Sequence, residues 1–353
     1  MSGLRKLASA QFAQLTLALT LLTPVAYAQT KWSKLALFPE PAEEISGIVA
    51  AGKLYVFAGL APVWKPMGMV YEYDPGTDKW TRKKPMALPS HHVAFATYRG
   101  KIYAFGGFVL PHSGPPAWVP INNAWQYDPQ NDSWKVLAPL PTRRGSAVAA
   151  TVGDKIYVIG GVTNPAGAED QGISPTRPQL CLGTVEEYDP AANTWRERNP
   201  MPTPRNHAGV GVVDGKIYVI GGRVGAAFIG LASDVSVVEE YDPATNKWGA
   251  PRARMPTARS AMGVGVYGGH IYVAGGEYQD PHMMATFRAV ERYDPATNTW
   301  TTMPSMPVSR HGLAAGIIGN RLHLVGGDVQ SAGSGIDVST GEHDVLEFPA
   351  TEK

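Results

Sequence analysis

One short pattern occurs six times along the 353-residue chain. The heptapeptide KIYVIGG spans residues 155–161 and recurs unchanged at residues 216–222. Weaker copies begin at Lys53, Lys101, His270 and Arg321. The final glycines of the six copies are 48 to 61 residues apart, at Gly59, Gly107, Gly161, Gly222, Gly276 and Gly327. A chain made of copies of one such unit must pack them side by side, because a single unit cannot bury its own apolar face.

A second motif occurs once in each of the first five repeats. It reads YDPGTDKW at its first occurrence and YDPATNTW at its last, beginning at Tyr73, Tyr127, Tyr188, Tyr241 and Tyr293. Within DPATN, the Asp can cap a turn, the Pro presets φ, and the Asn tolerates the left-handed region. We therefore expect a tight turn between two strands, with the Tyr and Trp side chains filling the space between repeats. The tryptophans are Trp80, Trp134, Trp195, Trp248 and Trp300.

The paired glycines and the YDP…W motif, at a period near fifty residues, resemble the kelch family, in which each repeat is one four-stranded propeller blade. The resemblance covers nearly the whole chain after residue 28 and implies an all-β fold, a six-bladed kelch-type β-propeller over residues 29–353. The KIYVI run is β-branched and aromatic, as a buried strand should be. The small residues of AGVGVVDG (208–215) suit an inner strand near a crowded axis. Propellers perform many unrelated functions, so the fold alone defines none.

The sixth repeat ends without a Trp motif, and the N-terminal region supplies the missing strand. TKWSKLALFP (30–39) has the same Trp-to-Pro spacing as NTWRERNPMP (193–202) and NTWTTMPSMP (298–307). We predict that the N-terminal strand completes the last blade, which closes the ring and removes exposed sheet edges.

Residues 1–28 have the features of a secretory signal peptide. Arg5 and Lys6 precede an apolar segment with its core at 15–22, and AYA (26–28) supplies a small-x-small cleavage site. The segment is too short to span a bilayer. We expect a mature chain beginning near Gln29, in the periplasm or secreted, with no membrane association after cleavage.

Charge and cysteine content exclude several other classes. The formal net charge is +1, which argues against a nucleic-acid or membrane-surface partner. The one cysteine, Cys181, cannot form an intramolecular disulfide, and we interpret it as a tolerated loop residue. No glycine-rich phosphate loop, HExxH or CxxC motif is present. We expect a monomer.

Two sets of segments should meet at the channel entrance of such a propeller: the starts of the inner strands and the loops after the double glycines. Four of six inner-strand starts carry Arg at the same position: Arg144, Arg205, Arg259 and Arg310. Nearby are His91, His92, Asn206, His207, Ser260, His311, Glu43 and Glu44. Three post-glycine loops open with charge, at Arg223, Glu277 and Asp328, and three with Leu60, Phe108 and Val162.

The arginines admit two interpretations. They could satisfy carbonyls and carboxylates within the blades. Alternatively, they could form a positive ring that attracts anionic ligand groups, as arginines on this face hold acidic peptides in BTB–kelch adaptors. We favour the binding ring. The expected ligand-binding residues are Arg144, Arg205, His207, Arg223, Arg259, Glu277, Arg310, His311 and Asp328.

Three functions are compatible with this sequence. The first is a non-catalytic module that binds a protein, peptide or carbohydrate ligand at the channel entrance. The second is a sugar mutarotase, because the chain also resembles N-acetylneuraminate epimerase; that resemblance implies Glu277 and Arg288 as catalytic candidates, a proton-transfer group and a carboxylate clamp. The third is a copper-radical oxidase, for which Cys181 and three histidines (His91, His92 and His207) are available but lack recognisable ligand spacing. We favour the binding module, with no cofactor and no metal ion.

Overall fold

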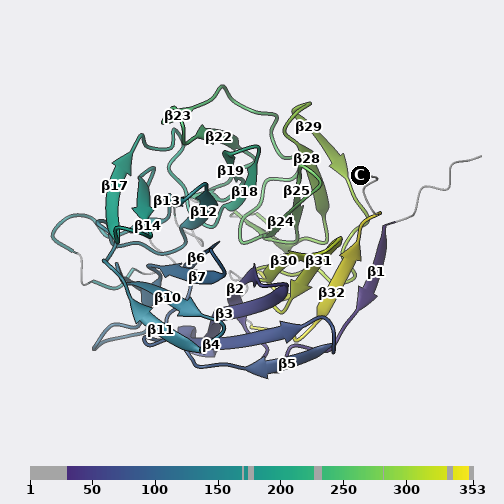
Figure 1. Ribbon diagram of the computed structural model, residues 1–353, viewed down its shortest axis with the longest axis horizontal. Helices are drawn as coiled ribbons and strands as arrows, with labels where there is room; N and C mark the ends of the chain where they lie inside the picture. The colour runs from purple at the N-terminus through teal and green to yellow at the C-terminus, as the bar shows by residue number, and fades with distance from the viewer. Residues whose placement is uncertain are drawn as a thin grey trace, which may run out of the picture.

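A computed structural model describes residues 30–168, 171–173, 179–225, 233–280, 282–331 and 337–349. The expected signal peptide at 1–28 lies outside these residues. Six four-stranded antiparallel sheets surround a central axis, which confirms the six-bladed propeller (Figure 1). Within the described part of the chain, no helix has the length and apolar character needed to cross a bilayer.

Each blade runs outward from a short inner strand beside the axis. From innermost to outermost, the first three blades are β2 (Glu43–Ala50), β3 (Lys53–Ala61), β4 (Lys65–Asp74) and β5 (Lys79–Arg82); β6 (Ala94–Tyr98), β7 (Lys101–Phe105), β10 (Ala124–Asp128) and β11 (Ser133–Val136); and β12 (Val148–Val152), β13 (Lys155–Ile159), β16 (Val185–Asp189) and β17 (Thr194–Arg198). The last three are β18 (Gly209–Val213), β19 (Lys216–Ile220), β22 (Val238–Asp242) and β23 (Lys247–Trp248); β24 (Gly263–Tyr267), β25 (His270–Ala274), β28 (Val290–Asp294) and β29 (Thr299–Thr302); and β30 (Ala314–Ile318), β31 (Arg321–Val325), β32 (His343–Glu347) and β1 (Lys31–Lys34).

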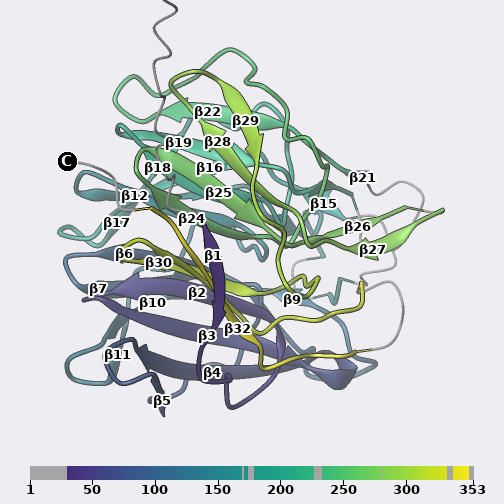
Figure 2. The same ribbon diagram turned by 90° about the vertical axis from the view of Figure 1, so that its right-hand side faces the viewer.

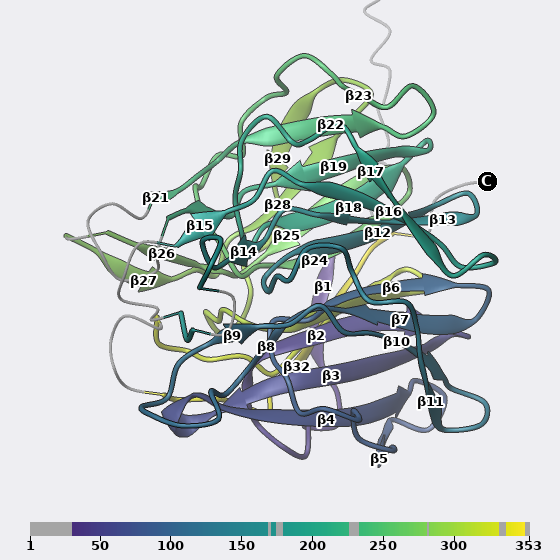
Figure 3. The same ribbon diagram turned by 90° about the vertical axis from the view of Figure 1, so that its left-hand side faces the viewer.

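Short hairpins and one 3-10 turn extend from the ends that follow the double glycines. The hairpins are β8 (Phe108–Val109) with β9 (Val119–Pro120), β14 (Val162–Thr163) with β15 (Leu180–Cys181), β20 (Arg223–Val224) with β21 (Ser233–Asp234), and β26 (Glu277–Gln279) with β27 (Met284–Thr286); the turn is η1 (Pro62–Trp64). They lie on one side of the disc, and β26 and β27 project furthest (Figures 2 and 3). We call this side the loop face.

Inner strands carry small residues because neighbouring blades approach closely at the axis. A Cβ on Gly47 of β2 would lie 2.5 Å from the backbone N of Ala315 in β30. A Cβ on Gly265 of β24 would lie 2.8 Å from side-chain atoms of Ile317 and Leu322. The second strand of each blade is almost wholly buried, as its β-branched and aromatic sequence predicts.

The YDP…W motif ties each blade to the one before it. In blade 3, the Tyr188 hydroxyl donates to Asn193 Oδ1 over 2.6 Å, and the Ala138 N–H donates to the same oxygen over 2.9 Å. Trp195 Nε1 donates to the Ala138 carbonyl over 2.9 Å. Asn193 has φ of 54°, a conformation that Asn tolerates better than most residues. The Tyr and Trp therefore fill the gap between blades, as expected.

The N-terminal strand closes the ring. Strand β1 pairs antiparallel with β32, with Trp32 opposite Leu346 (Figure 1). Trp32 Nε1 donates to the Pro304 carbonyl over 3.2 Å, which repeats the contact of the other motif tryptophans. Phe38 is buried against Tyr71. The predicted closure is confirmed.

Candidate functional site

A central channel with a cavity of about 550 Å³ is lined by the six inner strands. Its end at the loop face is formed by one residue per blade, at the position just before or at the start of each inner strand. We call these residues the entrance ring: Glu44, His92, Ser146, His207, Ala261 and Gly312. All six have φ between 50° and 57°, the left-handed region that favours glycine.

Backbone hydrogen bonds between blades fix the entrance ring. The Ser146 N–H donates to the His92 carbonyl over 3.0 Å, and the His207 N–H donates to the Ser146 carbonyl over 3.1 Å. The same link joins Ala261 to His207 and Gly312 to Ala261, each over 3.0 Å. The ring side chains are therefore carried on a backbone that each neighbouring blade holds in place.

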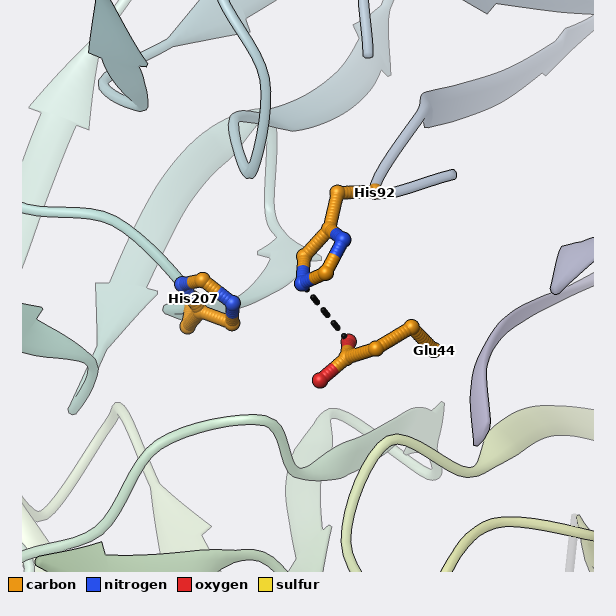
Figure 4. Close-up of side chains that lie close together, drawn as sticks. All are labelled: Glu44, His92 and His207. Atoms are coloured by element: carbon orange, nitrogen blue, oxygen red, sulfur yellow. Dashed lines mark ion pairs between the residues drawn. The ribbon is translucent and has the colours of Figure 1, made fainter. Parts of the chain in front are cut away.

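Three of these side chains converge at the axis. Glu44, His92 and His207 each offer one ligand atom, and these atoms lie within 4.8 Å of one another (Figure 4). His92 Nε2 lies 3.2 Å from Glu44 Oε2, and the two imidazole centroids are 4.7 Å apart. Ser146 Oγ is 3.5 Å from His207 Nε2. Two imidazoles and one carboxylate form a donor set suited to a transition-metal ion.

Adjacent residues orient the two histidines. Asn206 Oδ1 contacts His207 Nδ1, and His91 Nδ1 contacts His92 Nδ1. Burial, followed by the charge of Arg223, holds the pKa of His207 well below its usual value. Burial alone would raise the pKa of the Glu44 carboxyl, but the charge of His92 beside it holds that pKa well below its usual range. The cluster therefore combines an ionised carboxylate with at least one neutral imidazole.

A buried charged network, next to the entrance ring, connects blades 4, 5, 6 and 1. Arg223 Nη1 donates to Glu277 Oε1 over 2.9 Å, and Gln279 Nε2 donates to Glu277 Oε2 over 2.6 Å. His311 Nε2 is 3.4 Å from Glu43 Oε2 and 3.7 Å from Glu277 Oε2. Burial would lower the pKa of His311, but these carboxylates, Glu277 foremost, raise it to about 10. The network is internally compensated and closed from solvent.

On the side of blades 2 and 3, the corresponding positions are apolar. Phe108, Trp118, Val162 and Ile173 form one buried cluster, with the rings of Phe108 and Trp118 stacked at 5.4 Å. The loops that open with Phe108 and Val162 therefore form an apolar cluster, and the loops that open with Arg223 and Glu277 form the charged network.

The four arginines do not form a binding ring. Each is at most 1% exposed and points into its own blade, where it pairs with a carboxylate of the third strand. The pairs are Arg144–Glu186, Arg205–Glu239, Arg259–Glu291 at 3.1 Å and Arg310–Asp344 at 2.6 Å. They also donate to carbonyls of the double-glycine segment or nearby strands, as Arg310 Nη1 does to Gly326 over 3.1 Å. The predicted anion-binding role was wrong, because a guanidinium this deeply buried requires a carboxylate partner inside the protein.

The expected catalytic pair is not assembled either. Glu277 is fully buried in the charged network, whereas Arg288 is exposed and its Nε donates to the Met306 carbonyl. No contact between them is recorded within the described residues. Cys181 accepts hydrogen bonds from Asn206 Nδ2 and the Gly225 N–H, and no tyrosine contacts its sulfur in the described part of the chain. This arrangement does not match the Tyr–Cys crosslink of a copper-radical oxidase.

Of the nine expected ligand-binding residues, only His207 lines the channel. Arg223, Glu277, His311 and Asp328 are buried behind it. Glu44 and His92, which complete the cluster with His207, were noted as neighbours of the arginines but not included among the expected ligand-binding residues; His92 was considered, with His91 and His207, only for the copper-radical oxidase. The available signal was their position, two residues after the arginine position, in three different blades.

Several loops of the loop face carry exposed apolar side chains. Seven large hydrophobic residues among the described ones are more than a third exposed. Five of these lie in post-glycine segments: Leu110, Leu180, Met283, Met284 and Val338. Met283 and Met284 lie at the end of the β26–β27 hairpin, the segment that projects furthest (Figure 2).

Comparison with known proteins agrees with this architecture. The sequence model of the KLHDC2/KLHL20/DRC7 Kelch-repeats domain matches residues 19–199 and 139–327. Kelch-like protein terF of Aspergillus terreus is 30% identical over 295 residues, which make up 82% of this chain and 61% of that protein. Human Kelch repeat and BTB domain-containing protein 12 is 34% identical over 207 residues, 55% of this chain and 32% of that protein. The chain thus spans about a third to three fifths of the length of these relatives.

The structure of YjhT superposes with a TM-score of 0.73 at 19% identity, covering 91% of this chain and 99% of that one; it supports the fold alone.

Proposed function

Because this chain belongs to the kelch-repeat family, we propose that it is an exported binding protein whose loop face recognises a protein or peptide partner. The proposal rests on one observation: five of the seven exposed large apolar side chains lie in loops of that face, and two of them, Met283 and Met284, are adjacent at the end of one hairpin. Large exposed apolar groups that gather on one surface are typical of interaction sites. Methionines are especially suited to this role, since their flexible thioethers adapt to varied partner surfaces.

The loop face also has the construction of a binding platform. Its hairpins differ in length and sequence, while the blades beneath them are nearly identical. The charges of the buried network are paired with one another, Arg223 with Glu277 and His311 with Glu43 and Glu277, so they do not form an exposed charged surface. Recognition by the exposed apolar groups of the hairpins therefore replaces the anion recognition that the arginines suggested.

The partner is tested by cross-linking in the producing cell, followed by a direct binding measurement with each enriched protein. The variant carries Met283→Ser and Met284→Ser. Its matched control carries Leu37→Ser and Val136→Ser, which remove two apolar residues that are at least as exposed, one from the segment after β1 and one from the outer strand of blade 2. We expect at least about a tenfold loss of affinity for the first pair, as for central interface residues, and unchanged affinity for the control. Equal losses, or no loss in either, would contradict the proposed surface.

Export is tested separately, by fractionation and N-terminal sequencing. A mature chain that begins near Gln29 in the periplasmic or secreted fraction supports the proposal. Full-length protein retained in the cytoplasm with Met1 or Ser2 at its start would contradict it, without affecting the assignment of the binding face.

A further inference from the structure

The entrance ring holds large side chains at positions where the fold favours glycine. All six ring residues adopt the left-handed conformation, and in blade 6 the residue is Gly312. Blade 5 has Ala261, the smallest residue with a Cβ. Blade 3 has Ser146, and blades 1, 2 and 4 place the larger Glu44, His92 and His207 there, although a Cβ disfavours this backbone conformation. The backbone geometry alone does not explain these three residue types.

The three largest side chains of the ring are also the three that converge. They come from blades 1, 2 and 4, and their ligand atoms lie within 4.8 Å of one another at the axis (Figure 4). An ion bound at 2.0–2.2 Å to three ligands in tetrahedral geometry holds the ligand atoms about 3.4 Å apart, so the wider separations here must close when an ion binds. His92 Nε2 and Glu44 Oε2, 3.2 Å apart, already have such a separation, so the imidazole of His207, which lines the channel, would have to move toward them.

The hydrogen bonding of the histidines leaves nitrogen atoms available. His207 Nδ1 lies against Asn206 Oδ1, a pure acceptor, so Nδ1 carries the proton and Nε2 presents its lone pair. This is the outer contact that usually orients a metal-binding histidine. His92 is 7% exposed, and its Nε2 is buried beside Glu44 Oε2, 3.2 Å away. A cation between these two atoms would satisfy both.

We propose that Glu44, His92 and His207 bind one divalent first-row transition-metal ion at the loop-face end of the channel. Two imidazoles and one carboxylate select such ions over Mg²⁺ and Ca²⁺, which prefer all-oxygen sites. Three protein ligands leave coordination positions open, and the channel of about 550 Å³ lies directly beside them. The bound ion would accept water or a small anionic ligand from the channel.

The test uses untagged protein stripped of metal with a chelator. Titration with Zn²⁺ by calorimetry and with Co²⁺ by visible absorption should show one saturable site. Four-coordinate Co²⁺ bound through nitrogen would give intense d–d bands that aqueous Co²⁺ lacks. Glu44→Gln and His207→Gly should each weaken binding at least about a hundredfold, as loss of a direct ligand does.

Two comparisons make the result decisive. His207→Gly places in blade 4 the residue that blade 6 already has, so it removes the ligand without backbone strain, and an unchanged melting temperature confirms folding. His282→Ala removes an exposed histidine of the β26–β27 hairpin and controls for adventitious binding. Binding in a 1:1 ratio that His282→Ala preserves and His207→Gly abolishes supports the site. Absence of a saturable site in the wild-type protein, or equal binding by wild type and His207→Gly, would overturn it and leave His92–Glu44 as an ion pair only.

Discussion

The arginine position and the entrance-ring position lie two residues apart in the same segment of each blade. Their side chains nevertheless point in different directions, and the residue type varies more from blade to blade in the ring. The arginine side chains point into their own blades and pair with carboxylates there. Two residues later, the side chains point to the shared axis, where six blades supply Glu, His, Ser, His, Ala and Gly. A residue that serves its own blade can be the same in every blade.

A residue at the axis meets its counterparts from the other blades, so identical large or charged groups there would repel or collide. In this propeller the repeated arginine belongs to the framework, whereas the varied residues at the axis include the three that we propose as a binding site. The predictions below test this difference, beginning with the framework.

Removing residues 30–39 should have the largest effect. The deletion leaves β32 with an unpaired edge and exposes the core around Phe38. Loss of one buried Phe alone costs about 3–5 kcal/mol, and loss of strand pairing adds to it. We expect aggregation, or a melting temperature lower by about 10 °C or more. A chain that begins at Thr30 is the control, and equal melting of the two chains would show that the N-terminal strand is dispensable.

Arg205→Ala and Arg259→Ala should each destabilise the protein by about 3–5 kcal/mol, because each leaves a buried carboxylate, Glu239 or Glu291, without its partner. Arg196→Ala is the control, since that arginine is exposed and its pair with Glu187 is worth at most about 1 kcal/mol. Chemical denaturation measures all three. Unchanged stability of both buried-arginine variants would contradict the framework role and restore the binding ring.

The framework was largely predictable from the sequence, whereas the site was not. The Trp-to-Pro spacing at Trp32 predicted closure because the same local geometry recurs in every blade. The partners of the arginines were missed although Glu186, Glu239 and Glu291 also repeat, each two residues before the Tyr of YDP. Those pairs connect the first and third strands of one blade.

The cluster at the axis was even harder to predict from the sequence than the arginine pairs. Glu44, His92 and His207 are separated by 48 and 115 residues, and they meet only because the ring closes with a particular blade number and radius. No spacing rule within one strand or loop relates them. Function at a symmetry axis therefore has to be sought by aligning the repeats and comparing equivalent positions.

Blade 6 has histidines, His323 and His343, where most other blades have Tyr and an apolar residue. We expect these two histidines to make the stability of the closed ring depend on pH. His323 Nδ1 and His343 Nε2 lie 2.9 Å apart, both buried. Burial lowers the pKa of His323 to about 4 and that of His343 to about 3. Both folded-state values lie below the unfolded value of about 6.5, so the unfolded chain binds protons that the folded chain excludes. Stability should therefore fall as the pH drops below about 6.5, by about 2 kcal/mol per histidine at pH 5.

The measurement is the free energy of unfolding of wild type and His343→Val at pH 7.5 and pH 5. Valine is the residue at this strand position in blades 3, 4 and 5, namely Val185, Val238 and Val290. We expect a smaller acid-induced loss in the variant than in the wild type, whatever its stability at pH 7.5. Identical losses would show that these histidines do not control the acid response.

The smallest effects should come from the entrance ring, where the sign of the change depends on backbone conformation. His207→Gly removes a side chain from a residue with φ of 50°, and this relief offsets the lost contacts with Asn206 and Ser146. Without added metal ion, we expect stability within about 1 kcal/mol of wild type. Gly312→Ala is the opposite change at the equivalent position, and its new Cβ would lie 2.7 Å from the Glu44 backbone N. It should therefore destabilise the protein by about 1–2 kcal/mol, through strain and close contact. If removing the large histidine cost more than adding this one methyl group, His207 would belong to the framework, and the distinction between the two positions would fail.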